Sequence, residues 1–226
     1  DAAGALWSLA AASSNQSLIA TEGGIAPLVA LLSDGSAGAQ ETAAGALHSL
    51  AELDTNRDRI SEAGGVALLV ALFEKGSADA KEQAAGALSA MVVKNPANQN
   101  EVAKGLVDVL ISSNSLSAQQ HVTKLLYHLS RDQENRGALS KWGAIPQLAN
   151  QVRDGSQHGD VELVDNAANA LAQIALKSPQ HRVQVTAQLI ALLGSPVLEV
   201  RQRAWSALKD MANVGGADSQ MTVAMA

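Results

Sequence analysis

Side chains that commonly carry catalysis or bind metals are few in this sequence and are not spaced for either task. The 226 residues include five histidines and no cysteine. No two histidines stand at positions i and i+4, the spacing that sets two imidazoles on one helical face for zinc. His121 and His128 would lie roughly 10 Å apart along a helix, too far to share one ion. A phosphate-binding loop motif is also absent. We therefore expect no enzymatic activity, no cofactor and no metal site.

A set of polar side chains is better suited to binding than to catalysis. The set combines hydrogen-bond donors and acceptors with a tyrosine, in a chain that has only five aromatic residues. Its members are Lys124, Tyr127, His128, Arg131, Asn169 and Gln173. The first four recur at i, i+3, i+4 and i+7, so they share one face of a predicted helix. We predict that this set contacts a protein partner. The alternative is a solvated helix face with Tyr127 partly packed.

Composition narrows the possible partners. Sixteen Lys and Arg residues against 22 Asp and Glu residues give a formal charge of −6, the wrong sign for binding nucleic acid. No run of apolar residues is long enough to cross a bilayer, so we expect no membrane insertion. No targeting motif is visible, which leaves the compartment unknown with the cytoplasm favoured. The oligomeric state is left open.

The elements that must position these side chains come from an internal repeat. The string AAGAL occurs at residues 2–6, 43–47 and 84–88, a spacing of 41 residues both times. Between these copies, GGIAPLVALL at 23–32 returns as GGVALLVALF at 64–73. Apolar residues within each unit recur at helical spacing, and no segment alternates as a strand would. The sequence therefore predicts helical units that stack on their neighbours.

This pattern resembles the armadillo repeat. The resemblance consists of a short first helix with N-x-x-x-I, a glycine corner, a second helix with L-V-x-L-L and a long third helix with A-A-G-A-L. It covers roughly residues 1–213 and implies an all-α, right-handed α-solenoid of about five three-helix repeats after an opening helix. The expected bounds are 1–14 for the opening helix, 15–55, 56–94, 95–131, 132–177 and 178–213 for the repeats, and 214–226 for a tail.

Three details depart from the repeat pattern. Repeats three and five lack the glycine corner, so their first and second helices are expected to be fused, and the last repeat is HEAT-like. We interpret GSQHG at 155–159 as a loop that lengthens its linker by about four residues, an insertion that serves contact in some repeat arrays and is neutral in others. Because the sequence opens within a third helix, we expect a fragment or a processed product, with an expression boundary as the alternative.

The resemblance also implies where a partner would bind. Armadillo third helices line a concave groove, and the sixth residue after the first alanine of AAGAL is typically an asparagine that holds the backbone of an extended peptide. That column here reads Ser8, Ser49, Ala90, His128, Gln173 and Asp210. Recognition of a nuclear localisation signal is therefore not expected, because the asparagine ladder is missing. We predict that Ser49 and Trp7 also line the groove, since tryptophan is favoured at interaction hot spots.

Two tryptophans and two glycines lead to further expectations about packing. Trp142 is expected to be exposed and Trp205 to pack against a neighbouring repeat. Gly45 and Gly86 stand within predicted helices, where glycine costs about 1 kcal/mol relative to alanine. Gly45→Ala should therefore stabilise the protein unless a partner or a neighbouring third helix contacts this position.

The predicted function is a non-catalytic protein–protein interaction scaffold or adaptor that binds a peptide segment or helix along its concave groove. One alternative is the substrate-binding armadillo arm of a larger protein, such as a U-box-type ubiquitin ligase. A less favoured alternative is a helical-repeat lyase or chaperone for a chromophore, for which the sequence has few aromatic residues.

Overall fold

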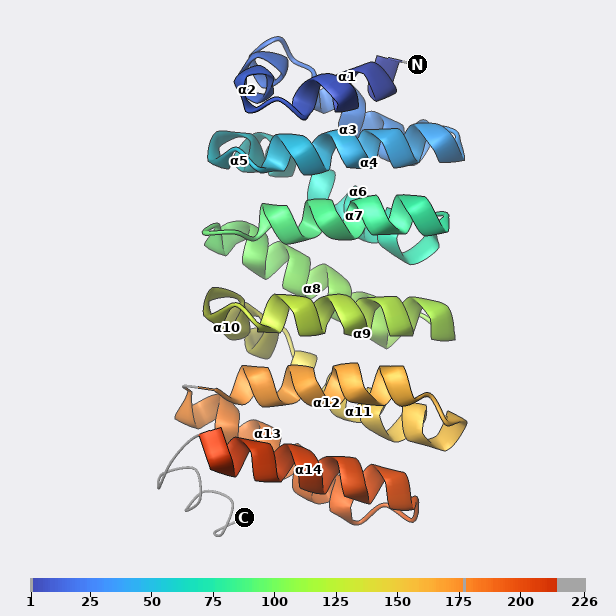
Figure 1. Cartoon of the computed structure of the whole chain (residues 1–226), viewed down its shortest axis with the longest axis vertical. Helices are drawn as coiled ribbons and strands as arrows, with labels where there is room; N and C mark the ends of the chain where they lie inside the picture. Colours follow the sequence, from blue (N-terminus) through green and yellow to red (C-terminus); the bar gives the residue numbers. More distant parts are fainter. Residues whose placement is uncertain (1, 177, 215–226) are drawn as a thin grey trace. The chain divides into compact units, whose positions relative to one another are not determined.

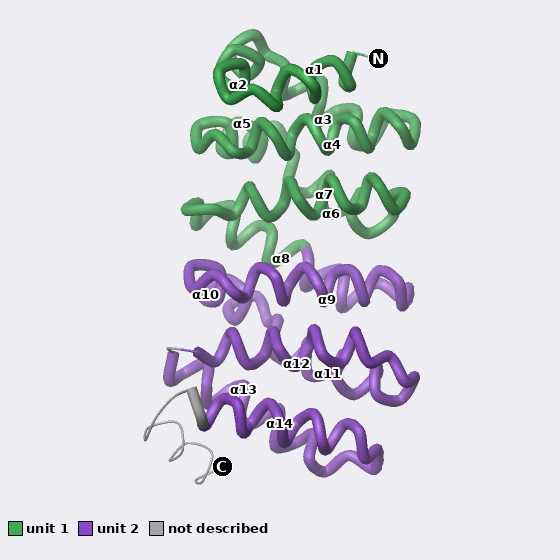
Figure 2. Tube along the Cα trace, in the orientation of Figure 1, with its two compact units in different colours: residues 1–105 green, residues 106–226 purple. Residues whose placement is uncertain are grey.

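The computed structural model describes residues 2–176 and 178–214, in which every regular element is an α-helix (Figure 1). The all-helical class expected from the sequence is confirmed. The predicted tail lies outside the described residues except for Val214, which ends the last helix. The chain divides into two compact units, Asp1–Gly105 (unit 1) and Leu106–Ala226 (unit 2), and the boundary falls within helix α8 (Figure 2).

Unit 1 is built around three neighbouring helices, α1, α4 and α7, with α4 in contact with both of the others (Figure 1). Helix α3 packs against α4, and α6 packs against α7. The elements of this unit are α1 (Ala2–Ala10), α2 (Ser13–Thr21), α3 (Ile25–Asp34), α4 (Ala37–Ala51), α5 (Asp54–Glu62), α6 (Gly65–Lys75), α7 (Ala78–Met91) and the first part of α8 (Pro96–Ser112).

The glycine corners place the short helices at an angle to one another. Gly64 has a φ of +78°, in the left-handed region that favours glycine. The next residue is restricted for a different reason, because a Cβ atom on Gly65 would lie 2.6 Å from Ile60 Cγ2 and 2.7 Å from the Ile60 carbonyl oxygen. The two glycines therefore allow α6 to begin directly against α5. Gly23 and Gly143 have similar φ values, at the glycine corners of two other three-helix repeats.

The asparagine of N-x-x-x-I ties each first helix to the end of the preceding third helix. Asn56 is fully buried, and its amide donates to the carbonyl oxygens of Leu50, at 3.0 Å, and Gln16, at 3.2 Å. Asn98 and Asn135 make the equivalent bonds to Met91 and Leu129. Carbonyl groups at a helix C-terminus lack partners within the helix, so these amides satisfy them where water is excluded.

Unit 2 repeats the arrangement, with α12 in contact with both α9 and α14. Helix α11 packs against α12, and α13 packs against α14. The remaining elements are α9 (Leu116–Ser130), α10 (Gln133–Lys141), α11 (Ala144–His158), α12 (Val161–Ala175), α13 (Pro179–Leu193) and α14 (Leu198–Val214).

Two predictions about helix lengths have different outcomes. The fusion of first and second helices is confirmed, because α8 and α13 each run without a break through the position of the missing corner. The prediction of a loop at GSQHG is wrong. These residues form the last turn of α11, which has 15 residues against 11 in α6, and Gly159 ends the helix with a φ of +71°. Gly155 is buried against α12, and this packing supports the extra turn.

None of the described helices is by itself long and apolar enough to span a membrane. Helices α2 and α3 reach the required length and composition only when taken together, and they meet at an angle of 85°.

Candidate functional site

Helix α9 presents a polar face because most of its apolar side chains are buried on the opposite side, although Leu116 in its first turn is exposed. Ser115 caps the helix by accepting a hydrogen bond from the Ala118 amide. The buried side chains recur at helical spacing and include Val122, Leu125, Leu126 and Leu129. Lys124 and His128 then fall on the exposed side, one turn apart. The predicted stripe on α9 is therefore accessible to solvent.

Helix α12 supplies the other half of the polar surface. Lys124 Nζ forms an ion pair with Glu162 at 3.1 Å, and Gln120 donates to Asp160 Oδ2 at 2.6 Å. Asp160 also caps α12, through a bond from the Leu163 amide to Oδ1. These bonds join side chains separated by about 40 positions in the chain, and they link α9 to α12.

A pocket of about 190 Å³ lies between the two helices. It is lined by Gln120, His121, Lys124, Glu162, Leu163 and Asn166. One turn further along both helices come His128 and the exposed Asn169. We call the surface formed by this pocket together with Tyr127, His128 and Asn169 the α9–α12 face.

Most of the residues around this pocket were not predicted from the sequence. Of its lining residues, only Lys124 was predicted. A signal was available, because Gln120 lies one turn before Lys124, and Glu162 and Asn166 are also one turn apart. Extending the predicted stripe toward the start of each helix, by one turn on α9 and by two turns on α12, would have included Gln120, Glu162 and Asn166.

Tyr127 and His128 add two rings to the α9–α12 face. Their centroids are 5.6 Å apart, and the ring planes are tilted by 35°. Tyr127 is half-buried, whereas His128 is exposed. Arg131 follows the end of α9 and is exposed. The structure therefore brings the predicted α9 residues together on one side of the helix.

Gln173 has a structural partner beneath this surface. Its Oε1 atom accepts a hydrogen bond from Arg136 Nη2 at 3.3 Å. The Arg136 guanidinium also donates to the carbonyl oxygens of Ser130 and Arg131. Burial lowers the pKa of Arg136 from its ordinary value, and the Asp132 carboxylate acts in the opposite direction. Gln173 is thus held at the joint between α10 and α12.

Trp7 lies in unit 1, where it packs on the neighbouring third helix. A Cβ atom added to Gly45 would lie 2.6 Å from Trp7 Cζ2. The same relation recurs one repeat later, where a Cβ atom on Gly86 would lie 2.7 Å from His48 Cε1. The bare backbone of each glycine therefore accommodates a ring from the preceding third helix. Of the two explanations that the sequence left open for Gly45, the structure supports contact with a neighbouring third helix.

Ser49 is half-buried, and its hydroxyl group donates to the carbonyl oxygen of Gly45 in its own helix, at 3.3 Å. Ser8 and Ser89 make the same bond one turn back, at 3.0 Å and 2.8 Å. Such bonds satisfy the hydroxyl group locally. Unit 1 therefore presents small side chains whose polar groups are already engaged.

The other two tryptophans differ from expectation. Trp142, expected to be exposed, is half-buried, and the Lys141 ammonium lies 5.3 Å from the centroid of its ring. The prediction that Trp205 packs against a neighbouring repeat is wrong, because 63% of its surface is exposed on α14. The equivalent residue in α12 is the buried Ala168, so the ring projects from the side of α14 that no described helix covers.

The titratable side chains do not gather into a metal site. Among residues 2–176 and 178–214, no group of three or more histidine, aspartate or glutamate side chains has the geometry to hold an ion. The polar groups of the α9–α12 face are arranged as hydrogen-bond donors and acceptors along two neighbouring helices.

Comparison with known proteins gives a family for part of the chain. Residues 13–52 match the family model described as Armadillo/beta-catenin-like repeat. The matched range contains α2, α3 and α4, which form one three-helix unit. A sequence search of curated proteins gives no match.

Solved structures extend the likeness to nearly the whole chain. An engineered protein from a structural genomics consortium is 25% identical, with a TM-score of 0.61 over 94% of this chain and 91% of that one. A designed armadillo repeat protein in complex with the peptide (KR)4 is 21% identical, with a TM-score of 0.61 over 93% and 92%. Computationally designed armadillo repeat proteins for modular peptide recognition are 22% identical, with a TM-score of 0.58 over 92% and 91%.

The chain therefore has an armadillo-like fold, and the resemblance seen in its sequence is confirmed. Neither the described residues nor these similar proteins favour the alternatives of a U-box-type ligase arm or a chromophore lyase.

Proposed function

We propose that the protein is a non-catalytic scaffold that binds an extended peptide segment of a protein partner, chiefly on the α9–α12 face. The proposal takes the chain as a right-handed solenoid of about five repeats, as its sequence predicts. The observation that carries it is the pocket of about 190 Å³ between α9 and α12, with exposed polar side chains from both helices around it.

The chemistry of these side chains suits the backbone of a peptide. An extended peptide presents unpaired N–H and C=O groups in alternation, so a binding surface must both donate and accept hydrogen bonds. The amides of Asn166 and Asn169 can do both, and Lys124 and Glu162 add a donor and an acceptor. Tyr127 offers a half-buried ring, of the kind enriched at interaction hot spots.

The similar solved structures give further support. Two of them are named as designed armadillo repeat proteins, one in complex with a peptide and the other made for modular peptide recognition. Their low sequence identity relates them to this chain by fold, so the choice of peptide depends on the residues of the α9–α12 face.

A selection experiment tests the proposal. Peptides are first selected on the wild-type protein from a random display library, and their affinities are measured by calorimetry. The triple variant Tyr127→Ala, His128→Ala and Asn169→Ala should then bind these peptides at least tenfold more weakly, which corresponds to about 1.4 kcal/mol. Circular dichroism verifies that the helices are intact.

Matched controls lie in the same unit. Arg153 and Gln180 are exposed polar residues on α11 and α13, away from the α9–α12 face. Their replacement by alanine should leave the affinity unchanged. If the triple variant binds as tightly as the wild type, or if Trp7→Ala in unit 1 causes the larger loss, the site proposed here is wrong.

A further inference from the structure

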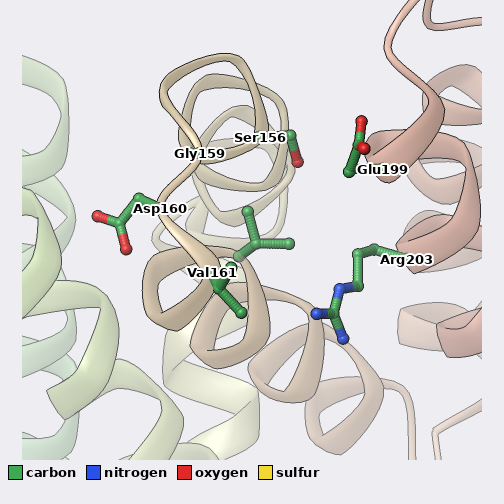
Figure 3. A pocket seen from close by; sticks show the side chains of 8 residues that line it. Ser156, Gly159, Asp160, Val161, Glu199 and Arg203 are labelled. Carbon is green, nitrogen blue, oxygen red and sulfur yellow. The ribbon is translucent and has the colours of Figure 1, made fainter.

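A second pocket in unit 2, of about 60 Å³, lies where the last turn of α11 meets the starts of α12 and α14. Figure 3 shows Ser156 and Gly159 of α11 and Val161 of α12 on one side, with Glu199 and Arg203 of α14 opposite. None of its lining residues belongs to the α9–α12 face as defined above. It is a separate site, at the far edge of α12.

The extra turn of α11 builds one wall of this pocket. Gly155 allows the turn to approach α12 closely, because a Cβ atom there would lie 3.0 Å from Val164 Cγ2. Gly159 then ends the helix in the left-handed conformation and turns the chain into α12. In α3 and α6 the helix ends about one turn earlier, so this wall is particular to α11.

The floor of the pocket is apolar and its rim is polar. Val164 is buried beneath the pocket, while Val161 is 60% exposed beside it. The Ser156 hydroxyl group at the rim donates to the Val152 carbonyl oxygen. A volume of about 60 Å³ has room for roughly four or five groups the size of water, which is enough for a slender aliphatic chain.

The charges around the rim favour a cation. Arg203 already pairs with Asp165, at 2.7 Å, and Asp160 accepts from Gln120 and from the Leu163 amide. Glu199 has no hydrogen-bond or ion-pair partner among the described residues. Among the lining residues, an incoming anion would therefore meet the carboxylates of Asp160 and Glu199 and only one guanidinium group, that of Arg203, which is already paired with Asp165.

We propose that this pocket binds the side chain of a lysine residue from a protein partner. The methylene groups of the lysine would lie on Val161 and Val164, and its ammonium group would reach the Glu199 carboxylate at the rim. The compact ammonium group matches a site that offers one unpaired carboxylate. This inference rests on the proposed function, to which it adds a second, specificity-determining contact.

Methyl NMR on the full chain can test the site directly. The probes are three short serine-glycine peptides that differ only in a central lysine, norleucine or glutamate. The lysine peptide should give saturable shifts at the Val161 and Val164 methyl groups. The norleucine peptide should bind there more weakly, and the glutamate peptide should give no shift. Equal binding of lysine and norleucine, shifts with glutamate, or no shifts with lysine would overturn the proposal.

Two surface substitutions separate the contribution of the ion pair with Glu199 from that of the apolar contact with Val161. Glu199→Gln should weaken binding of the lysine peptide about twofold to fivefold, as expected for an exposed ion pair. Val161→Ser should weaken both the lysine and norleucine peptides about fourfold, through loss of apolar contact. Both residues are exposed, so the fold should tolerate the changes.

The chain offers a matched control for each substitution. Glu134 is also an exposed glutamate in the first turn of a helix, and Val183 is 57% exposed on α13. Glu134→Gln and Val183→Ser should not change the binding. If these control variants weaken binding as much as the pocket variants do, the lysine peptide binds through nonspecific electrostatic or hydrophobic contacts and the proposal is wrong.

The two proposals fail in distinguishable ways. If library-selected peptides depend on the α9–α12 face while the lysine peptide leaves the Val161 and Val164 methyl groups unchanged, only the lysine pocket is refuted. If the methyl shifts appear but the triple variant on the α9–α12 face binds its peptides normally, the proposed function is refuted while the pocket stands as a lysine site.

Discussion

The two units join their helices by different means, although both are built from the same three-helix pattern. In unit 1, rings fill the space between third helices, with Trp7 packed over Gly45 and His48 over Gly86. In unit 2, polar side chains meet instead, as in the pairs of Lys124 with Glu162 and of Arg203 with Asp165.

This difference indicates which unit is available for a partner. Trp7 and His48 are each half-buried by packing over a glycine, whereas an exposed ion pair is worth only about 0–1 kcal/mol and can exchange its partner at little cost. The serine hydroxyl groups of unit 1 are also engaged, within their own helices. Between the third helices, unit 2 therefore has polar groups that a peptide can recruit, while the serine hydroxyl groups of unit 1 are engaged within their own helices.

The largest expected effect concerns the buried arginines Arg57 and Arg136, which donate hydrogen bonds to carbonyl oxygens near the ends of third helices. Arg57 donates to the carbonyl oxygens of Ala51, Glu52 and Val93, so Arg57→Met should lower the free energy of unfolding by about 3 kcal/mol, measured by chemical denaturation. Arg136→Met in unit 2 should cost less, about 2 kcal/mol, because one of its three acceptors is the Gln173 side chain, which can turn to water.

Arg59 is the control for this pair, since it is an exposed arginine on the same helix as Arg57. Arg59→Met should change stability by less than about 0.5 kcal/mol. If Arg136→Met lowers the free energy of unfolding as much as Arg57→Met does, the two buried arginines contribute equally and the two units do not differ in this respect.

A double-mutant cycle tests the packing of a ring over a glycine. Gly45→Ala should destabilise the wild-type protein by about 1–2 kcal/mol, because the new methyl group displaces the indole ring. In a Trp7→Ala background the same change should stabilise by about 1 kcal/mol, since only the helix propensity of alanine remains. Thermal and chemical denaturation of the four proteins measure the coupling.

Gly137 provides the reference for propensity alone. It lies within α10 of unit 2, and a Cβ atom there would meet nothing within 4 Å. Gly137→Ala should therefore stabilise by up to about 1 kcal/mol. If Gly45→Ala also stabilises the protein when Trp7 is present, the packing of the indole ring does not require glycine at position 45. The account of how the third helices of unit 1 pack is then wrong.

The smallest expected effect belongs to the ion pair across the α9–α12 face. A cycle of Lys124→Met and Glu162→Gln should give a coupling of less than about 0.5 kcal/mol, which disappears at high salt, because both side chains are exposed. A coupling well above 1 kcal/mol that persists in salt would mean that unit 2 is locked as firmly as unit 1.

The fold is more predictable from the sequence than the site is, for a physical reason. Helical periodicity and the fused α8 and α13 are local features, readable from short windows. GSQHG was misinterpreted because two glycines normally indicate a loop, whereas packing against α12 keeps that turn helical. The exposure of Trp205 was missed because no pattern within α14 shows which side lacks a covering helix.

By itself, the sequence determined that the chain is helical, repetitive and armadillo-like, and that polar residues mark α9 and α12. Only the tertiary structure decided which of these residues meet. Gln120 and Asp160 are 40 positions apart in the chain, so their contact depends on how one three-helix unit lies against the next. The same packing places the half-buried Trp7 over Gly45 and leaves Glu199 without a partner among the described residues. The sequence gives the type of each side chain, but which side chains pair and which stay exposed depends on the surfaces that neighbouring helices bury.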